Sequence, residues 1–305
     1  MSHQRDVRGT IKTVGIVGSG TMGRRIALSC IINDKETRLY HKSTEKVQAA
    51  MEAVRELIEE RIDNGQLGGE VLEAAMTLLK GAASLEACVS GADLVIESVP
   101  ERLNLKRIVL GEIDRLIHPG TLVCTGTSSI PGSKLADTLK RPDTFFCINF
   151  SGPDDLKVEV MGHHLAAQAT IDAAMAFVRE IGLVPILVRK EIMGYAYNRV
   201  WRAIKKEVLF LLHGGYTTAE DIDRAFMLDW NVPIGPCGLM DEIGLDVIRD
   251  IEMNYFNASG DPSDQPPQFL LDLIAGGRLG VKSGEGFYTY PNPAYKRPGF
   301  LKGDT

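Results

Sequence analysis

The stretch Val14-Gly15-Ile16-Val17-Gly18-Ser19-Gly20-Thr21-Met22-Gly23 decides the fold, because an apolar strand here enters a glycine-rich turn that a predicted helix follows. In a G-x-G-x-x-G turn, Gly18 allows a tight bend, Gly20 lets the backbone approach a pyrophosphate, and Gly23 lets helix and strand pack closely. The N–H groups at the start of the helix, Arg24–Ile32, then point toward the phosphates. The sequence therefore predicts a dinucleotide-binding loop formed by Gly18, Ser19, Gly20, Thr21, Met22 and Gly23.

The end of the second predicted strand bears on which dinucleotide binds. A strand at this place commonly ends in Asp or Glu, whose carboxylate binds the ribose 2′-hydroxyl of NAD. Here Tyr40 is followed by His41, Lys42 and Ser43, with no carboxylate. These three side chains can hold a 2′-phosphate, but a solvated strand end and a helix cap also account for them. The sequence favours NADP over NAD as the cofactor and leaves NAD open.

The fold class follows from the alternation of short apolar runs with amphipathic stretches, which is typical of a parallel sheet covered by helices. The stretch Glu45–Asn64, for example, has one apolar face at helical spacing. Strands are predicted at Thr13–Val17, Thr37–Tyr40, Ala92–Val99, Thr121–Thr125, Thr144–Asn149, Lys157–Met161 and Val184–Val188.

Beyond Lys190 the strand pattern stops, and Met193–Leu212 and Thr218–Met227 are predicted to be helices. We therefore expect an α/β protein with an N-terminal Rossmann NAD(P)-binding domain over residues 1–190. An all-α substrate and dimerisation domain is expected to follow over residues 191–305. The tail from Pro291 is rich in Pro, Gly and Lys, and we expect it to be poorly ordered.

Composition excludes several classes of protein. A net charge of -6 argues against a nucleic-acid partner, which calls for a basic face. The five cysteines are odd in number and widely spaced, which favours neither a disulfide framework nor a metal site. No signal peptide and no apolar run of about 18 residues is visible, so no membrane partner is expected. We expect a soluble, cytoplasmic protein that acts on a small molecule.

Further motifs resemble those of the 3-hydroxyacyl-CoA dehydrogenase family, in the same order and over nearly the whole chain. The stretches that carry the resemblance are Ala92–Glu101, Thr127–Ser129, Gly194–Arg199, Glu220–Asp223, Gly235–Pro236 and Gly280–Tyr288. The resemblance implies an NAD(P)-dependent dehydrogenase or reductase that acts on CH–OH groups. It also implies a homodimer formed through the all-α domain.

The resemblance assigns roles to particular residues. Ser128 and Asn198 would form hydrogen bonds with the substrate oxygen, and Glu159 would orient the acid–base residue. Glu101 and Lys106 would contact the nicotinamide half of the cofactor, and Val99, Pro100 and Ser128 would also bind the cofactor.

The chain departs from the family at the catalytic histidine. The family motif reads H-x-x-N-P, whereas here Asn149 takes the histidine position and Gly152 replaces the asparagine. An amide cannot take up a proton near pH 7, and general acid–base catalysis is worth about 10²–10⁴-fold in rate. Asn149 is therefore expected to support the polar network of the site without being its proton donor.

Several residues can replace the histidine, although each also has an ordinary structural explanation. These candidates are Asp154, Asp155, Lys157, Tyr195 and Tyr197. We interpret His163 and His164 as part of a solvated turn, and His118 as the end of a helix.

The acyl-CoA end of the substrate site also differs. The positions that would contact CoA on the helix after the second strand are Leu57 and Asn64, in a largely acidic stretch that disfavours phosphates. Lys282, at another CoA-contacting position, is retained. A smaller non-CoA substrate, or one carried on an acyl carrier protein, is therefore at least as well supported as a CoA thioester.

The leading hypothesis is an NAD(P)-dependent oxidoreductase that transfers hydride to or from a hydroxy or oxo carbon. Two alternatives stay open. One is an imine or iminium reductase, and the other is a catalytically weak NAD(P)-binding sensor or partner protein.

Overall fold

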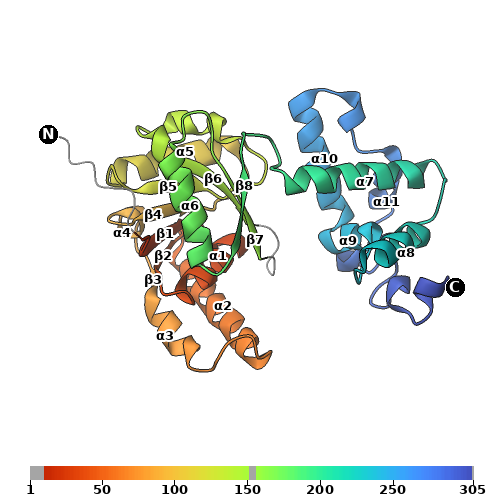
Figure 1. Ribbon diagram of the computed structural model, residues 1–305, viewed down its shortest axis with the longest axis horizontal. Helices are drawn as coiled ribbons and strands as arrows, with labels where there is room; N and C mark the ends of the chain where they lie inside the picture. Colours follow the sequence, from red (N-terminus) through yellow and green to blue (C-terminus); the bar gives the residue numbers. More distant parts are fainter. Residues whose placement is uncertain (1–9, 151–155, 304–305) are drawn as a thin grey trace. The chain divides into compact units, whose positions relative to one another are not determined.

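The computed structural model describes residues 10–150 and 156–303 and divides the chain into two compact units. The first unit comprises residues 1–197 and the second comprises residues 198–305 (Figure 1). Each unit has a hydrophobic core of its own. No helix in the described ranges is long and apolar enough to cross a membrane.

The first unit is built on an eight-stranded sheet in the order β3-β2-β1-β4-β5-β6-β7-β8. Neighbouring strands are parallel except for β6 and β7, which pair antiparallel. The strand order reverses at β1, which lies between β2 and β4, and such a switch point is where dinucleotides bind. The strands are β1 (Thr13–Val17), β2 (Glu36–Tyr40), β3 (Leu79–Gly81), β4 (Leu94–Glu97), β5 (Leu122–Thr125), β6 (Phe145–Phe150), β7 (Lys157–Met161) and β8 (Val184–Val188).

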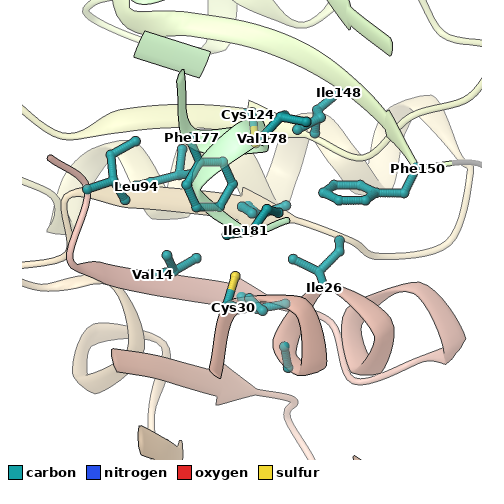
Figure 2. Packing of buried hydrophobic residues seen from close by; sticks show 14 of the residues in the cluster. Val14, Ile26, Cys30, Leu94, Cys124, Ile148, Phe150, Phe177, Val178 and Ile181 are labelled. Carbon is teal, nitrogen blue, oxygen red and sulfur yellow. The ribbon is translucent and has the colours of Figure 1, made fainter. Parts of the chain in front are cut away.

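Helices cover both faces of this sheet, which explains why its central strands are apolar on both sides. Figure 2 shows part of the resulting core, where Ile26 of α1 and Phe177 of α6 pack near Val14, Leu94 and Ile148 of the sheet. The helices of the first unit are α1 (Thr21–Ile31), α2 (Thr44–Asp63), α3 (Val71–Leu78), α4 (Leu85–Val89), α5 (Leu103–Leu116) and α6 (Gln168–Glu180).

The second unit is helical, and two buried carboxylates organise it. Asp223 accepts hydrogen bonds from the N–H groups of Cys237 and Gly238 and from the Tyr288 hydroxyl. Asp241 accepts hydrogen bonds from the N–H groups of Phe287 and Tyr288. The C-terminal motifs of the sequence are therefore structural. The helices are α7 (Tyr197–His213), α8 (Ala219–Trp230), α9 (Pro236–Ile243), α10 (Leu245–Ser259) and α11 (Gln268–Ala275).

The α/β fold class with an all-α second part is confirmed. One strand was not predicted, and two local predictions are wrong. β3 was not predicted, because three residues are too few to show an alternating pattern. The helix expected from Met193 begins at Tyr197, because Gly194 and Tyr195 adopt positive φ angles of 79° and 55°. The other wrong prediction concerns the tail.

In the described residues, the tail after Pro291 is folded and contributes to the core of the second unit. Tyr295 and Phe300 are buried there, within the short 3-10 helices Ala294–Lys296 and Phe300–Lys302. Arg224 of α8 donates a hydrogen bond to the carbonyl oxygen of Phe300 and stacks over its ring. The Pro-, Gly- and Lys-rich composition of the tail predicted poor order, because composition does not show that Tyr295 and Phe300 are buried.

Phe300→Ala should destabilise the second unit, because it removes a ring that is 4% exposed from the core. We expect a loss of about 3–5 kcal/mol in the free energy of unfolding, measured by urea denaturation. Leu301→Ala is the matched control, because Leu301 is 46% exposed. Equal unfolding midpoints for the two variants would show that the tail contributes nothing to the core.

Candidate active site

The glycine loop after β1 has the geometry of a phosphate-binding turn. Gly18 has a φ of 126°, and a Cβ on it would lie 2.3 Å from the carbonyl oxygen of Ser98. A Cβ on Gly23 would lie 1.9 Å from the carbonyl oxygen of Gly18. A Cβ on Gly20 would have no described atom within 4 Å. The packing of the chain requires Gly18 and Gly23, whereas Gly20 leaves space for a ligand.

The start of α1 is available to an anion. Gly20 is its N-cap residue and offers no side chain to the N–H groups of the first turn, which begins at Thr21. Thr21 is exposed, while Ser19 and Met22 are half-buried. Unpaired N–H groups at a helix N-terminus bind phosphates.

The residues after β2 form a helix cap. The Ser43 hydroxyl accepts a hydrogen bond from the N–H of Lys46 and donates one to Glu45 Oε2 at 2.6 Å. The Ser43 N–H donates to His41 Nδ1 at 3.0 Å. Lys42 is exposed. The Ser43 hydroxyl is therefore already engaged, and a carboxylate lies beside it, which disfavours a phosphate at this point.

A buried ionic network lies behind β4. The ammonium group of Lys106, in α5, donates to both carboxylate oxygens of Glu97 at 2.9 and 3.1 Å and to the carbonyl oxygen of Val99 at 3.2 Å. The Val99 N–H and the Thr125 hydroxyl also donate to Glu97. Lys106 is 1% exposed, so it supports the turn through Val99 and Pro100 from inside the protein.

Glu101 connects this network to the turn that follows β5. Its Oε1 accepts hydrogen bonds from the Thr127 hydroxyl, from the N–H groups of Ser128 and Ser129, and from the Ser129 hydroxyl. Burial by itself would raise the pKa of Glu101, but Lys106 and these donors hold it below its ordinary value. Glu101 is thus ionised and fixes the backbone at Ser128.

The Ser128 side chain remains available. Its N–H is held by Glu101, the residue is exposed, and its hydroxyl has no hydrogen-bond partner among the described residues. A hydroxyl held in this way can donate a hydrogen bond to a substrate oxygen.

Asn149 and Glu159 form a buried pair across β6 and β7. The antiparallel register places the two residues opposite each other, and Asn149 Nδ2 donates to Glu159 Oε2 at 3.2 Å. The other carboxylate oxygen accepts the N–H groups of Ala196 and Tyr197, both at 2.9 Å. Only the NH₂ group of an amide can face a carboxylate, so Oδ1 of Asn149 is left to accept a hydrogen bond from another donor.

The proposed substitutes for the histidine differ in their suitability. Tyr195 is 1% exposed, its hydroxyl donates to the carbonyl oxygen of Thr127 at 3.0 Å, and burial raises its pKa far above its ordinary value. Tyr195 is thus a structural residue. Tyr197 is 49% exposed, and the Lys157 ammonium lies 3.9 Å from the centre of its ring. Asp154 and Asp155, like Gly152, lie outside the described residues.

His163 is not part of a solvated turn, contrary to the sequence-based interpretation. It is 7% exposed, its ring lies beside Phe145, and burial lowers its pKa below the ordinary value. Its Nδ1 accepts the N–H of Leu165. His118 is exposed two residues after the end of α5.

Two predicted site residues belong to the second unit. Asn198 is the second residue of α7, is half-buried and has no hydrogen bond to a described side chain. Lys282 forms an ion pair with both carboxylate oxygens of Asp246, at 2.6 Å for Oδ2, and this lowers the pKa of Asp246. Lys282 therefore has a structural partner at the start of α10.

Sequence reasoning missed Glu97 and Thr127, which hold Lys106 and Glu101 in place. The available signal was a Glu at the end of a buried strand followed nine residues later by a Lys on an amphipathic helix. Within the described ranges, no group of three or more His, Cys, Asp or Glu is arranged to hold a metal ion.

The fold and the glycine loop define a dinucleotide-binding protein, and comparison with known proteins identifies its family. The family model for the NAD binding domain of 3-hydroxyacyl-CoA dehydrogenase matches residues 13–192, and that for the C-terminal domain matches residues 194–290. The chain belongs to the 3-hydroxyacyl-CoA dehydrogenase family. It is a dehydrogenase of the class that acts on CH–OH groups, and its cofactor is NAD(H).

Similar proteins act on different substrates. The chain is 31% identical over 290 residues to the 5-formyl-3-hydroxy-2-methylpyridine 4-carboxylate 5-dehydrogenase of Mesorhizobium japonicum, covering 92% of this chain and 91% of the relative. It is 29% identical over 282 residues to the 3-hydroxybutyryl-CoA dehydrogenase of Bradyrhizobium diazoefficiens, covering 92% and 96%. The crystal structure of (S)-3-hydroxybutyryl-CoA dehydrogenase from Ralstonia eutropha matches with a TM-score of 0.86 and 31% identity, covering 93% of this chain and 100% of that one.

The loop geometry predicts different results for two glycine substitutions. Gly20→Ala should leave the free energy of unfolding within about 0.5 kcal/mol of wild type but should weaken NADH binding at least about tenfold. The reason is that the added methyl group meets no described atom and would enter the space where the backbone of such a loop approaches the pyrophosphate. The measurements are urea denaturation and NADH fluorescence titration.

Gly23→Ala is the contrasting variant, because its Cβ would collide with the carbonyl oxygen of Gly18. It should lose stability and NADH binding together. Unchanged NADH affinity in Gly20→Ala would contradict the assignment of this loop to the pyrophosphate.

Proposed function

We propose that the protein transfers hydride between NAD(H) and the hydroxy or oxo carbon of a compact, non-CoA substrate, with Asn149 as a hydrogen-bond acceptor. The observation that carries the proposal is the Asn149 Nδ2 to Glu159 Oε2 hydrogen bond, which leaves the amide oxygen for the substrate. An acceptor oxygen binds a hydroxyl group well and a carbonyl oxygen poorly. The arrangement therefore suits an alcohol, or the hydrate of an aldehyde, as the bound group.

In this proposal the substrate hydroxyl donates its hydrogen bond to Asn149 Oδ1. The Ser128 hydroxyl donates to the same substrate oxygen, and Asn198 supplies a further contact by its family position. Bound NAD would supply the hydride acceptor for the carbinol carbon. Asn149 cannot accept the hydroxyl proton, so this proton would leave its hydrogen bond with Oδ1 and pass to water.

Three observations support a substrate without CoA. Leu57 and Asn64, at the positions where the resemblance places CoA contacts, carry no positive charge. Lys282 is engaged with Asp246. The Mesorhizobium relative is named for a pyridine carboxylate and not for a CoA thioester.

An imine or iminium substrate is the second candidate. A protonated imine nitrogen carries an N–H that can donate to the same Asn149 oxygen, and its reduction by NADH needs no further acid. Assays of NADH formation or consumption with 3-hydroxy acids, aldehydes, CoA thioesters and cyclic imines separate these candidates. Tight NADH binding without turnover of any of them would favour the sensor or partner protein.

The pH profile tests the role of Asn149. In wild type, alcohol oxidation should rise with pH without an inflection near neutrality, because position 149 does not titrate. Asn149→His should increase kcat/KM about 10²- to 10⁴-fold and introduce an inflection near the ordinary histidine pKa of about 6.5. Steady-state kinetics with the best alcohol from the panel, from acid to alkaline pH, measures both.

Asn149→Ala is the control, since it removes the amide oxygen without adding a titratable group. It should lower kcat/KM and keep the wild-type pH profile. A wild-type inflection near neutrality that persists in Asn149→Ala would show that another side chain takes the proton, against this proposal.

The choice between NAD and NADP follows from the helix cap at Ser43. The prediction of NADP stays untested, and the exposed Lys42 is the residue that supports it. Glu45, next to the Ser43 hydroxyl, should repel a 2′-phosphate, so we expect NADH to bind about tenfold more tightly than NADPH. Glu45→Gln should reduce the difference between the NADH and NADPH affinities. Glu59→Gln, which replaces another exposed carboxylate of α2, should leave that difference unchanged.

Fluorescence titration with both cofactors measures these affinities. Tighter binding of NADPH than of NADH to the wild-type protein would instead support Lys42 as the 2′-phosphate ligand. The homodimer implied by the family and the cytoplasmic location both stay predictions.

A further inference from the structure

The peptide group that joins Thr127 to Ser128 is held at both of its ends. Its N–H, which belongs to Ser128, donates to Glu101 Oε1 at 3.1 Å. Its carbonyl oxygen, which belongs to Thr127, accepts a hydrogen bond from the Tyr195 hydroxyl at 3.0 Å. The C=O and N–H bonds of a planar trans peptide point in opposite directions. Glu101 and Tyr195 therefore hold this peptide from opposite sides, and its orientation determines the direction of the Ser128 side chain.

The Tyr195 hydroxyl is the only donor that the described residues offer to this carbonyl oxygen. Thr127 is fully buried, and it lies beyond the end of β5 at Thr125, outside the hydrogen bonds of the sheet. A buried carbonyl that loses its donor has to turn toward another donor or toward water. Removal of the Tyr195 hydroxyl would therefore free one end of the peptide that carries Ser128.

Tyr195 is itself held firmly in place. Its ring belongs to a buried cluster with Cys147, Met161 and Val188. Its backbone has a φ of 55°, which is uncommon for a bulky residue and persists only where surrounding contacts maintain it. A hydroxyl on so fixed a ring has one position, so it can set the position of the group that it binds.

The segment that contains Tyr195 also contacts the other half of the site. The next two N–H groups of the chain both donate to Glu159 Oε1 at 2.9 Å. The other oxygen of this carboxylate accepts the Asn149 amide. One short segment thus holds both the turn that carries Ser128 and the carboxylate that orients Asn149.

We propose that Tyr195 is a positioning residue for the reaction, whose hydroxyl fixes, through the carbonyl oxygen of Thr127, the direction in which Ser128 donates to the substrate oxygen. This role rests on the proposed function, in which Ser128 makes that contact. Tyr195 is too deeply buried, at 1% exposed, to contact the substrate itself. Burial raises the pKa of its phenol far above the ordinary value, so the hydroxyl stays a neutral donor and takes no part in proton transfer.

Tyr195→Phe tests this role, because it removes the hydroxyl and keeps the ring. It should lower kcat about 10- to 100-fold, which is the effect expected when a group at the reacting atoms is displaced. KM and the affinity for NADH should stay within about twofold of wild type, because the contact with Ser128 strengthens only as negative charge develops on the substrate oxygen. Steady-state kinetics with the best alcohol from the panel measures both constants. The pH profile should keep its wild-type shape, and a changed profile would overturn the inference by showing that Tyr195 takes part in proton transfer.

Ser128→Ala separates positioning from a general structural effect. In the Ser128→Ala background, Tyr195→Phe should change kcat by less than about twofold, because the hydroxyl that Tyr195 positions is absent. An equal fall in kcat in both backgrounds would overturn the inference.

Tyr255→Phe is the matched control. It also removes a buried hydroxyl, but one that has no hydrogen-bond partner among the described residues. It should keep the wild-type kcat. A fall as large as that in Tyr195→Phe would show that the loss of any buried tyrosine hydroxyl has this effect, against the inference.

Hydrogen exchange tests the same role without a substrate. The amide protons of Ser128 and Ser129, both bound to Glu101, should exchange about tenfold or more faster in Tyr195→Phe and at the wild-type rate in Tyr255→Phe. Unchanged exchange in Tyr195→Phe overturns the inference.

The two proposals can fail separately. If no substrate in the panel turns over, the proposed function fails, and faster exchange in Tyr195→Phe still supports the hold of Tyr195 on the Ser128 peptide. If kcat falls in Ser128→Ala but not in Tyr195→Phe, the proposed function is supported and the role of Tyr195 is overturned.

Discussion

The buried carboxylate of Glu159 is the constraint on which the candidate site depends. A desolvated carboxylate needs donors for both oxygens, and here they are the Asn149 amide on one side and the N–H groups of Ala196 and Tyr197 on the other. The Glu159 carboxylate therefore orients Asn149, which takes the position of the family's histidine, and it also caps the start of α7. Because this carboxylate accepts a hydrogen bond from the NH₂ group of Asn149, it also determines that Oδ1 of Asn149 faces away from Glu159.

A second buried network fixes the other half of the site. Lys106 and Glu97 hold the turn after β4, and Glu101 holds the turn that carries Ser128. The Tyr195 hydroxyl joins the two regions through the carbonyl oxygen of Thr127. Lys106, which the family resemblance assigns to cofactor contact, is almost fully enclosed and instead holds Glu97 and the carbonyl oxygen of Val99. Buried polar networks of this kind give a site rigidity only when each member has a partner.

Much of the fold could be predicted because its signals are local. The glycine loop, the apolar strands and the amphipathic α2 each show their pattern within a few residues, and the predicted strands agree with the structure to within about two residues at most ends. The exceptions depend on distant contacts. Phe300 is ordered because Arg224 and the core of the second unit hold it, and His163 is buried because Phe145 covers it. Neither contact is visible in local composition.

The sequence by itself determined the cofactor-binding loop, the α/β class and the loss of the titratable histidine at Asn149, because residue type and spacing decide these. Only the tertiary structure decided which end of the Asn149 amide is left for a ligand, because that depends on a carboxylate across the antiparallel pair of β6 and β7. It also brought the Tyr195 hydroxyl to the carbonyl oxygen of Thr127. These two residues lie 68 positions apart in the chain, and only the packing of the segment before α7 against the turn after β5 places them together.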